Sequence, residues 1–557
     1  MSLALIILTA LAVLWLAERS VEHLKLAVAA LCVSTAVLLF VVTDLERAIL
    51  LSSILAVGIF GASSVKYDHS GLKLIATDLP LAFAGTVPFL LAQYPVALAA
   101  VAAGSVALML AAAATIFYVR GPPVSLELQI LFFGIACVAL VAAYKASGGP
   151  VTFQRNATLR RCFLSSFIAS LLNPHSWRQF GGLTLSDIAK EPLPLMAAVP
   201  ARNPDYPDII IIQHESIFDP RLFGLPVEPI VESFLSPQDG LHGSLNVDIF
   251  GGGSWQSEFS LLTGLSSASF GSNAYFLFKR GAGRFHSSLP KTLAALGYKT
   301  MLTSSCRRSF LSYDRFYRSI GINERLFTDD FQPPFDVDRF ETTSSDALFL
   351  DAALNAHMKG IAEDASPRFL YVLTNFNHGP HNRKLVAPGR FEGERAFAAA
   401  SLPDAQYAEY YARLAETAVA WNKFKSELAA RFPNRPTLIM HYGDHQPVMT
   451  RRIERKLKLD PDARRQFRTF YAMETLNDCS DRIPRGRGAD LDIAFLGTVV
   501  LQHAGLPLDE IYATRASLLE HCGGAYFASS SERKRRFHRT LVDLGLIDVA
   551  PAVRYQR

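Results

Sequence analysis

The apolar positions of this chain fall into two patterns, long runs at the start and short runs further on. A helix that crosses a bilayer needs about 17–25 mostly apolar residues. Runs near that length cover Met1–Ala17, Leu24–Val42, Ala48–Val65, Val96–Val119 and Leu126–Tyr144. We therefore predict five membrane spans, the first retained as an anchor because no small-residue cleavage site follows a basic start. Leu79–Gln93 is apolar but short and carries two prolines, so we interpret it as an interfacial or re-entrant segment.

Beyond Arg202 short apolar runs alternate with amphipathic stretches, which predicts an α/β domain with a central, largely parallel sheet. Three runs resemble strands covered on both faces, namely Asp208–Ile212, Phe369–Thr374 and Thr437–Met440. The predicted organisation is a transmembrane domain over 1–146, a juxtamembrane helix and linker over 147–202, the α/β domain over 203–530 and a basic tail over 531–557.

The charges support this division and limit the choice of partners. Residues 1–146 hold 14 charged side chains of the 105, and the net charge of +5 lies wholly in the remainder. A balance this modest does not favour nucleic acid. With the N-terminus inside, five spans leave only Arg47 and Arg120 in cytoplasmic loops, so the positive-inside rule leans against export of the α/β domain. Long domains translocate largely regardless of charge, and a span at 79–93 would reverse the topology.

Each predicted strand ends in residues that bind metals. The first run leads to Glu215, the second to His378 and His381, and the third to His441, Asp444 and His445. Ligands collect outside the carboxyl ends of strands in open α/β sheets, so the three tails are expected to converge on one site. For any one of them alone, a turn or a helix N-terminal acid is the better explanation, and only the three together favour a metal site. His381 and His441 are explained equally well as ordinary loop histidines.

A nucleophile candidate follows a glycine run, Gly251-Gly252-Gly253-Ser254, at the start of a predicted helix. Glycines let the backbone approach a ligand closely, and the free N–H groups of a helix start attract an anion. A plain N-cap serine on a glycine loop explains the same pattern. Two carboxylates, one imidazole and the serine oxygen would suit Zn²⁺, while oxygen-rich ligation also suits Mn²⁺ or Mg²⁺.

These motifs resemble the sulfatase/alkaline phosphatase superfamily, in its membrane-anchored branch of lipoteichoic acid synthases, phosphoglycerol transferases and phosphoethanolamine transferases. The resemblance rests on Gln213-His-Glu-Ser-Ile-Phe-Asp219, Gly253-Ser-x-x-x-Glu258, His378-Gly-Pro380 and Tyr442-Gly-Asp-His445. It implies a five-span anchor before a sulfatase-like catalytic domain. That branch usually has threonine where this chain has Ser254, and the tryptophan and arginine that hold glycerophosphate in lipoteichoic acid synthases have no match after Gly297-Tyr298.

Residue by residue, the resemblance implies that Glu215, Ser254, Asp444 and His445 hold one divalent metal, Zn²⁺ or Mn²⁺, with Ser254 as nucleophile. It implies that His378 touches substrate phosphate or a second metal. We assign lower-ranked substrate contacts to His381, Arg307 and Arg308.

The function that follows is transfer of phosphoglycerol or phosphoethanolamine from a phospholipid donor to a periplasmic or cell-surface glycan or glycolipid, through a phosphoserine. The enzyme would lie in the bacterial inner membrane with its catalytic domain in the periplasm. A phosphodiesterase or phosphatase would use the same residues with water as acceptor. A sulfatase is disfavoured because the Cys/Ser-x-Pro-x-Arg segment is absent around Ser254. An inactive binding module and a transporter are the alternatives from other classes.

Overall fold

The computed structural model divides the chain into two compact units, Met1–Gly181 and Gly182–Arg557. It describes residues 3–70, 73–76, 78, 95–147, 161–173, 183–185, 188–202, 205–333, 335, 337–338, 341–460, 462, 464–477, 483–527, 529 and 531–549. The segment Leu79–Gln93 lies outside the described residues, as does Cys479. The finer division at 146, 202 and 530 stays a prediction.

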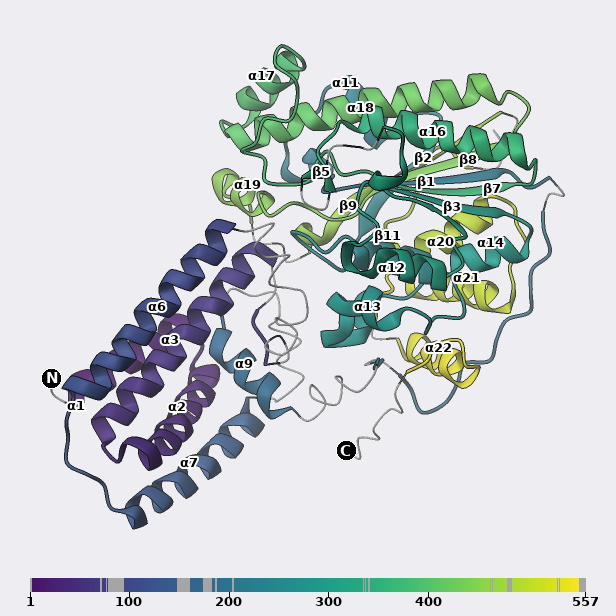
Figure 1. Cartoon of the computed structure of the whole chain (residues 1–557). Coiled ribbons are helices and arrows are strands. Elements are labelled where there is room, and N and C mark those ends of the chain that lie inside the picture. The colour runs from purple at the N-terminus through teal and green to yellow at the C-terminus, as the bar shows by residue number, and fades with distance from the viewer. Residues whose placement is uncertain are drawn as a thin grey trace. The chain divides into compact units, whose positions relative to one another are not determined.

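The first unit is a bundle of apolar helices (Figure 1). Its helices are α1 (Leu3–Glu18), α2 (Val21–Val42), α3 (Leu45–Ser70), α6 (Pro95–Tyr118), α7 (Leu126–Ala146) and α9 (Phe163–Leu172). Within the described residues, α2, α3, α6 and α7 are long and apolar enough to cross a membrane, while α1, with 16 residues, is shorter. The predicted apolar helical bundle is confirmed, with four helices of spanning length and one short helix at the five predicted places.

The bundle has two ends with different polar contacts. At one end the α2–α3 turn meets the loop before α7, because the amide of Val124 donates to the carbonyl of Thr43 (2.8 Å) and the Arg47 guanidinium donates to the carbonyl of Val119. At the other end the amide of Cys162 donates to the carbonyl of Glu18 (3.2 Å), where α9 begins. Arg47 and the loop that holds Arg120 therefore share the end opposite α9.

The second unit is built on one nine-stranded sheet (Figure 1). Its order is β10-β2-β9-β8-β1-β7-β3-β4, with β11 paired to β2. The strands are β1 (Asp208–His214), β2 (Leu241–Asn246), β3 (Lys299–Ser304), β4 (Glu324–Leu326), β7 (Arg368–Leu373), β8 (Thr437–Gly443), β9 (Arg468–Leu476), β10 (Gly486–Arg487) and β11 (Leu491–Asp492). Each pair in this sheet is parallel except those that β9 makes with β8 and β2, which confirms the largely parallel sheet.

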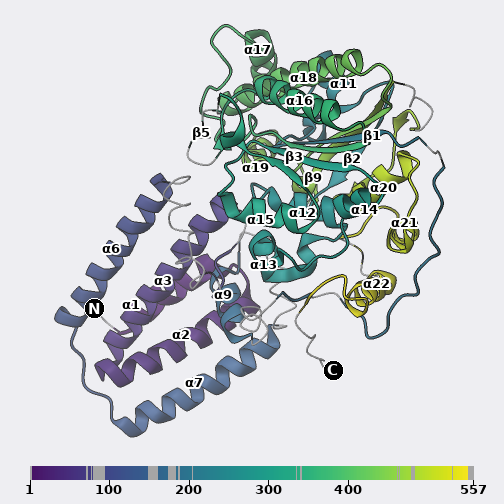
Figure 2. The same cartoon turned by 45° about the vertical axis from the view of Figure 1, so that its right-hand side comes forward.

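Helices cover both faces of the sheet, as Figures 1 and 2 show. One face carries α11 (Pro229–Leu235), α16 (Asp346–Glu363), α17 (Glu392–Ser401) and α18 (Ala405–Arg431). The other carries α12 (Trp255–Thr263), α14 (Leu289–Ala295), α20 (Ile493–His503) and α21 (Glu510–Cys522). The central strand β1 is buried along its whole length, as its continuous apolar run predicts.

Shorter helices complete the second unit, and two of them matter below. They are α13 (Leu277–Gly281), α15 (Tyr313–Ser319), α19 (Thr450–Leu457) and α22 (Glu532–Asp543). Helix α22 lies in the predicted basic tail, yet Phe537 is fully buried and the Thr540 hydroxyl donates to the carbonyl of Leu193 (2.7 Å). The basic run is thus the first full turn of a packed helix, and Lys534 within it is buried. The five cysteines in the described part of the chain are free thiols.

Candidate active site and metal centre

Glu215 stands directly after β1, where the chain turns away from the sheet. The next residue, Ser216, has a left-handed backbone (φ 57°), a conformation that few residues other than glycine adopt. This turn leaves the Glu215 carboxylate buried at 5% exposure, with Oε1 accepting a hydrogen bond from the Ser216 hydroxyl (2.9 Å). The apolar strand and the strained turn together place one carboxylate at the edge of the sheet.

Ser254 lies between the glycine loop and the first residue of α12. Gly251, Gly252 and Gly253 all have positive φ (78°, 139° and 94°), and a Cβ on Gly251 would come within 2.7 Å of the Val448 side chain. Ser254 itself has helical angles, and its side chain caps no backbone N–H. Its hydroxyl instead donates to Glu215 Oε2 at 2.7 Å. The plain N-cap explanation of this serine is therefore wrong.

Asp444 and His445 follow β8, which pairs in parallel with β1 so that His214 lies opposite Gly443. This register brings the two strand tails side by side. Asp444 Oδ1 accepts from the backbone amides of Ser216 (2.8 Å) and His445 (2.7 Å). Asp444 Oδ2 is buried and has no hydrogen-bond partner among the described residues.

The imidazole of His445 completes the cluster. Its Nδ1 lies 3.1 Å from the carbonyl of Gln446, which fixes the proton on Nδ1 and leaves Nε2 to face the carboxylates. Nε2 lies 3.1 Å from Glu215 Oε1, 3.4 Å from Ser254 Oγ and 3.6 Å from Asp444 Oδ2. A backbone carbonyl therefore orients this ring in the way that outer-shell groups orient metal-binding histidines.

The donor set fits a divalent cation. One ligand atom from each of Glu215, Asp444 and His445 lies within 4.8 Å of the others, and all three residues are buried. A buried carboxylate oxygen without a partner is costly, and a cation supplies what it lacks. Two carboxylates, an imidazole and a hydroxyl suit tetrahedral Zn²⁺, and the oxygen-rich set also suits Mn²⁺. The residues present therefore fit the cation that the sequence predicts.

The electrostatics of the cluster show the same need for positive charge. Burial and the neighbouring Glu215 carboxylate raise the pKa of Asp444 well above its usual range. Burial alone would lower the pKa of His445, but the carboxylates of Asp444 and Glu215 raise it to about 9. Two carboxylates this close are both ionised only beside a positive charge, such as the His445 imidazolium or a bound cation; otherwise one of them takes up a proton.

His378 lies on the loop after β7 and is half-buried. Its carbonyl accepts from the buried Arg413 guanidinium (2.9 Å), which anchors the loop. The charge of His378 acts on the Glu215 carboxylate, because it helps to lower the pKa of Glu215. His378 therefore lies beside the cluster without being part of it.

The other two predicted histidines, His381 in the loop after β7 and His441 on β8, point away from the cluster. His381 is buried, its Nε2 lies 2.9 Å from the carbonyl of Asn377, and its ring packs edge-on against Tyr410. His441 points to the opposite face of β8 and stacks on Trp421, with ring centroids 4.1 Å apart. Both rings support the structure around the site. A direct substrate contact for His381 stays a prediction.

The two arginines predicted to hold phosphate are engaged with carboxylates. Arg308 forms ion pairs with Asp314 (2.5 Å) and Asp330 (2.7 Å), and Arg307 lies 3.8 Å from Asp329. In the part of the chain that the structure describes, neither guanidinium makes a hydrogen bond or ion pair with the four cluster residues. Their role in phosphate binding stays a prediction.

Sequence reasoning missed the serines that hold the cluster together. The Ser257 hydroxyl donates to the carbonyl of Asp444 (2.7 Å), so the nucleophile helix is tied to the tail of β8. Ser216 holds both Glu215 and Asp444. Serine is common in turns and at helix starts, so no pattern along the chain marks these two residues.

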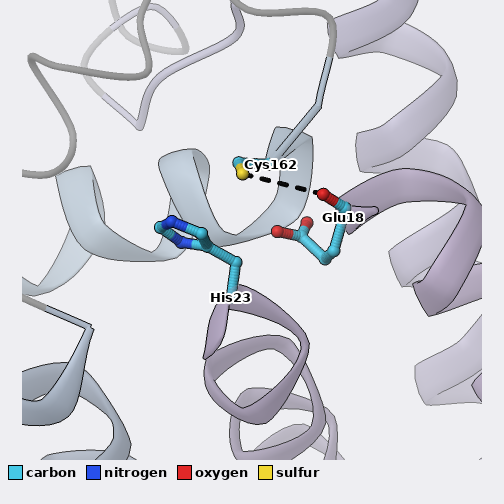
Figure 3. Close-up of side chains that lie close together, drawn as sticks. All are labelled: Glu18, His23 and Cys162. Carbon is cyan, nitrogen blue, oxygen red and sulfur yellow. Dashed lines mark hydrogen bonds between the residues drawn. The ribbon is translucent and has the colours of Figure 1, made fainter. Parts of the chain in front are cut away.

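A second group of metal-type side chains lies in the first unit, formed by Glu18, His23 and Cys162 (Figure 3). Glu18 Oε1 accepts from the amides of Leu164 (2.8 Å) and Ser165 (3.0 Å). Its Oε2 accepts from the Ser165 hydroxyl (2.5 Å), and the Cys162 thiol donates to the Glu18 carbonyl (3.6 Å). This carboxylate caps the N-terminus of α9, where free N–H groups favour an anion.

Comparison with known proteins identifies the domain that holds the first cluster. Residues 207–469 match the family model of the sulfatases, a span that includes all four cluster residues. An uncharacterized protein of Haemophilus influenzae is 25% identical over 312 residues, which are 55% of this chain and 54% of that protein. The chain thus matches about half the length of this curated relative.

Two solved structures of transferases are similar to this chain. The integral membrane protein lipooligosaccharide phosphoethanolamine transferase A from Neisseria meningitidis is similar over 90% of this chain and 96% of its own, with a TM-score of 0.51 and 13% identity. The phosphoglycerol transferase GacH from Streptococcus pyogenes, solved with sn-glycerol-1-phosphate, is similar over 62% of this chain and 87% of its own, with a TM-score of 0.46 and 16% identity. The first of these likenesses extends over both units.

Proposed function

Because residues 207–469 match the family model of the sulfatases, we propose that this chain is a membrane-anchored, metal-dependent transferase of the sulfatase/alkaline phosphatase superfamily. It moves a phosphoglycerol or phosphoethanolamine group from a phospholipid to a hydroxyl of a glycan or glycolipid. The observation that carries the proposal is the Ser254 hydroxyl, which caps no helix and lies 2.7 Å from Glu215 Oε2 in a buried cluster with an unpaired carboxylate oxygen. We take the two candidate groups, phosphoglycerol and phosphoethanolamine, from the activities of the two transferases named above.

Glu215, Ser254, Asp444 and His445 would hold one divalent cation, Zn²⁺ or Mn²⁺. When bound, the cation lowers the pKa of the serine hydroxyl and offsets the negative charge on the transferring phosphoryl group. The Ser254 hydroxyl proton already points at Glu215 Oε2, which is therefore placed to accept it. Ser254 stands at the start of α12, and a helix start favours a phosphate.

The reaction has two balanced displacements. In the first, Ser254 Oγ forms a bond to the lipid phosphorus, the bond from phosphorus to the diacylglycerol oxygen breaks, and diacylglycerol leaves with a proton. In the second, an acceptor hydroxyl forms a bond to phosphorus, the bond to Ser254 Oγ breaks, and the serine regains a proton. His378, half-buried beside the cluster, contacts the substrate phosphate in both steps.

The apolar bundle keeps this catalyst at the membrane that holds its donor. We place the catalytic domain on the outer, periplasmic side of a bacterial inner membrane. The end of the bundle that carries Arg47 then faces the cytoplasm. The positive-inside rule leans against this orientation, but long domains translocate largely regardless of charge. A reporter fused after Arg557 and active only in the periplasm supports this topology, and activity only in the cytosol contradicts it.

The direct test incubates the purified full-length chain with head-group-labelled phosphatidylglycerol and, separately, phosphatidylethanolamine. We expect diacylglycerol release with label trapped on Ser254, both lost in Ser254→Ala and with a chelator, and both kept in Glu18→Ala. Label that passes only to water, even when acceptor glycans are present, shows a phosphodiesterase instead. No turnover of either lipid overturns the donor assignment.

A further inference from the structure

A polar network with no assigned role lies buried between the sheet and the nucleophile helix. It joins α12 and α15 to the three central strands β1, β7 and β8. Its six members are each at most 2% exposed. They are Gln213, Glu258, Tyr313, Tyr317, Tyr371 and Tyr442.

The hydrogen bonds of this network converge on one carboxyl group. Gln213 Nε2 donates to Glu258 Oε1 (3.1 Å), and the amide oxygen of Gln213 accepts from the hydroxyls of Tyr371 (3.1 Å) and Tyr442. The Tyr313 hydroxyl donates to Glu258 Oε1 (3.3 Å), and the Tyr317 hydroxyl donates to Oε2. The amide of Gln213 therefore has one consistent orientation, with its oxygen toward the strand tyrosines and its nitrogen toward Glu258.

Three members of the network are close in sequence to residues of the metal cluster. Gln213 is two residues before Glu215, and Tyr442 is two residues before Asp444. Glu258 is one helical turn after Ser254, and its amide donates to the Ser254 carbonyl (3.1 Å). The contact between Gln213 and Glu258 thus ties the helix that carries the nucleophile to the strand that carries Glu215.

The network is costly for stability, which argues that it does more than fill space. A buried carboxyl group loses its hydration, and burial accordingly raises the pKa of Glu258 to about 7. Apolar side chains of similar volume often replace such groups without loss of stability. Fully satisfied polar networks do, however, hold their elements in one arrangement.

We propose that Glu258 is a positioning residue for the nucleophile, which it holds against the metal cluster through Gln213 on β1. Without this link the Ser257 contact to the Asp444 carbonyl still ties α12 to the tail of β8, but no side chain of α12 in the described part of the chain then donates to or accepts from β1. The Ser254 hydroxyl then samples positions away from Glu215, whereas Glu215, Asp444 and His445 keep their own contacts. For catalysis the inference rests on the proposed function, but the geometric claim about Ser254 stands apart from it.

The hydrogen-bond pattern provides a specific set of variants in the full-length chain. Glu258→Gln replaces one acceptor oxygen by an amide nitrogen, which faces a donor in either orientation: the Tyr317 hydroxyl, or Gln213 Nε2 and the Tyr313 hydroxyl. Gln213→Glu sets two carboxylates against each other. The double variant Gln213→Glu/Glu258→Gln restores an amide donor facing a carboxylate acceptor, with Tyr317, Tyr371 and Tyr442 still able to donate, whereas Tyr313 loses its acceptor. Asp492→Asn is the matched control, because it also replaces a buried carboxyl group by an amide. Burial raises the pKa of Asp492 to about 6. Asp492 accepts a hydrogen bond from the amide of Phe527 (2.6 Å), 35 positions further along the chain.

The first measurement is steady-state hydrolysis of a chromogenic phosphodiester by the metal-loaded chain, at a temperature where circular dichroism shows every variant folded. Because small misplacements of a reacting group cost up to about 100-fold, we expect Glu258→Gln to lower kcat about tenfold with KM within about twofold. Gln213→Glu should lower kcat further, and the double variant should recover at least about threefold. A kcat for Glu258→Gln equal to that of Asp492→Asn, or no recovery in the double variant, overturns the proposal.

The second measurement needs no catalysis. The visible absorption of Co²⁺ bound to the chain reports the ligands and geometry around the metal. We expect the Glu258→Gln spectrum to shift toward that of Ser254→Ala, the double variant to return toward wild type, and Asp492→Asn to match wild type. An unchanged Glu258→Gln spectrum overturns the positioning role. Turnover of the chromogenic diester without turnover of either phospholipid overturns only the lipid assignment.

Discussion

Two clusters in this chain each bring together three side chains that can bind a metal, yet their carboxylate oxygens have different hydrogen-bond partners. Glu215, Asp444 and His445 in the second unit, and Glu18, His23 and Cys162 in the first, each bring three ligand atoms within 4.8 Å of one another. Both oxygens of Glu18 are occupied by hydrogen bonds from the start of α9. In the other cluster Asp444 Oδ2 is buried and has no hydrogen-bond partner among the described residues, with the nearest cationic atom, His445 Nε2, 3.6 Å away.

The difference teaches that proximity alone does not make a metal site. A carboxylate that accepts hydrogen bonds from N–H and O–H donors at a helix start is stabilised as a helix cap and needs no metal ion. A carboxylate that is buried and left partly unpaired requires a cation, because the protein bears its desolvation without compensation. We therefore assign the metal to the Glu215 cluster and a capping role to Glu18.

The largest expected difference between the two clusters is in catalysis. Ser254→Ala removes the hydroxyl that lies between Glu215 and His445, and loss of a nucleophile typically costs at least about 10³-fold in kcat. Glu18→Ala should leave the kcat of folded protein within about twofold. Release of diacylglycerol from labelled phospholipid measures both. Equal losses in the two variants would show that the clusters are not functionally distinct.

Glu258 gives an intermediate case, a buried carboxyl with satisfied oxygens but no cation beside it. Its pKa is raised to about 7 from an ordinary value near 4.5, so the folded state binds this proton more tightly than the unfolded state. The stabilisation is complete below about pH 4.5 and is lost as the pH rises through about 7, a change on the order of 2–3 kcal/mol. We expect Glu258→Gln to flatten the fall in the free energy of unfolding between those pH values. Denaturant unfolding of the metal-free chain measures this pH dependence. If Glu258→Gln has the same pH dependence as the wild type, the Glu258 carboxyl is not the group that titrates.

Loss of the Glu18 cap should appear as lost stability. Glu18→Ala removes three hydrogen bonds at the start of α9, and loss of a cap costs about 1–2 kcal/mol. Thermal unfolding of the full-length chain in lipid nanodiscs measures the change, with the conservative Cys162→Ser as the control. A Glu18→Ala variant that unfolds at the wild-type temperature would remove the capping explanation.

The smallest effect is expected where the charges are exposed. Arg308 is 42% exposed and bonds Asp314 and Asp330, and such surface pairs contribute about 0–1 kcal/mol. Arg308→Ala should therefore change stability by less than about 1 kcal/mol and KM for a phosphodiester by less than about twofold. A tenfold rise in KM would instead establish Arg308 as the phosphate ligand that the sequence suggested.

The elements that periodicity controls could be predicted from the sequence. The run Asp208–Ile212 reads as a central strand because every position after the first is apolar, and β1 is indeed buried throughout. The tails after β1 and β8 converge because parallel strands end at one edge, so Glu215, Asp444 and His445 could be grouped from the amino-acid sequence alone. The use of Ser254 could not be decided, since a capping serine and a nucleophile look alike along the chain.

The contacts that support the site were beyond sequence reasoning for a physical reason. The network around Glu258 draws on Tyr313, Tyr371 and Tyr442, which lie on separate elements and meet only through tertiary packing. The Glu18 cap joins residues 147 positions apart. No local pattern predicts such pairings. The four basic residues at 533–536 likewise do not indicate that α22 packs against the rest of the unit through its own Phe537.

The most direct test of the central claim is the metal content of the purified full-length chain. After dialysis against Zn²⁺ or Mn²⁺ and removal of free metal, inductively coupled plasma mass spectrometry should find one equivalent in the wild type. We expect that equivalent to be retained in Glu18→Ala and lost in Asp444→Ala. Metal that disappears with Glu18→Ala and remains with Asp444→Ala would contradict the assignment.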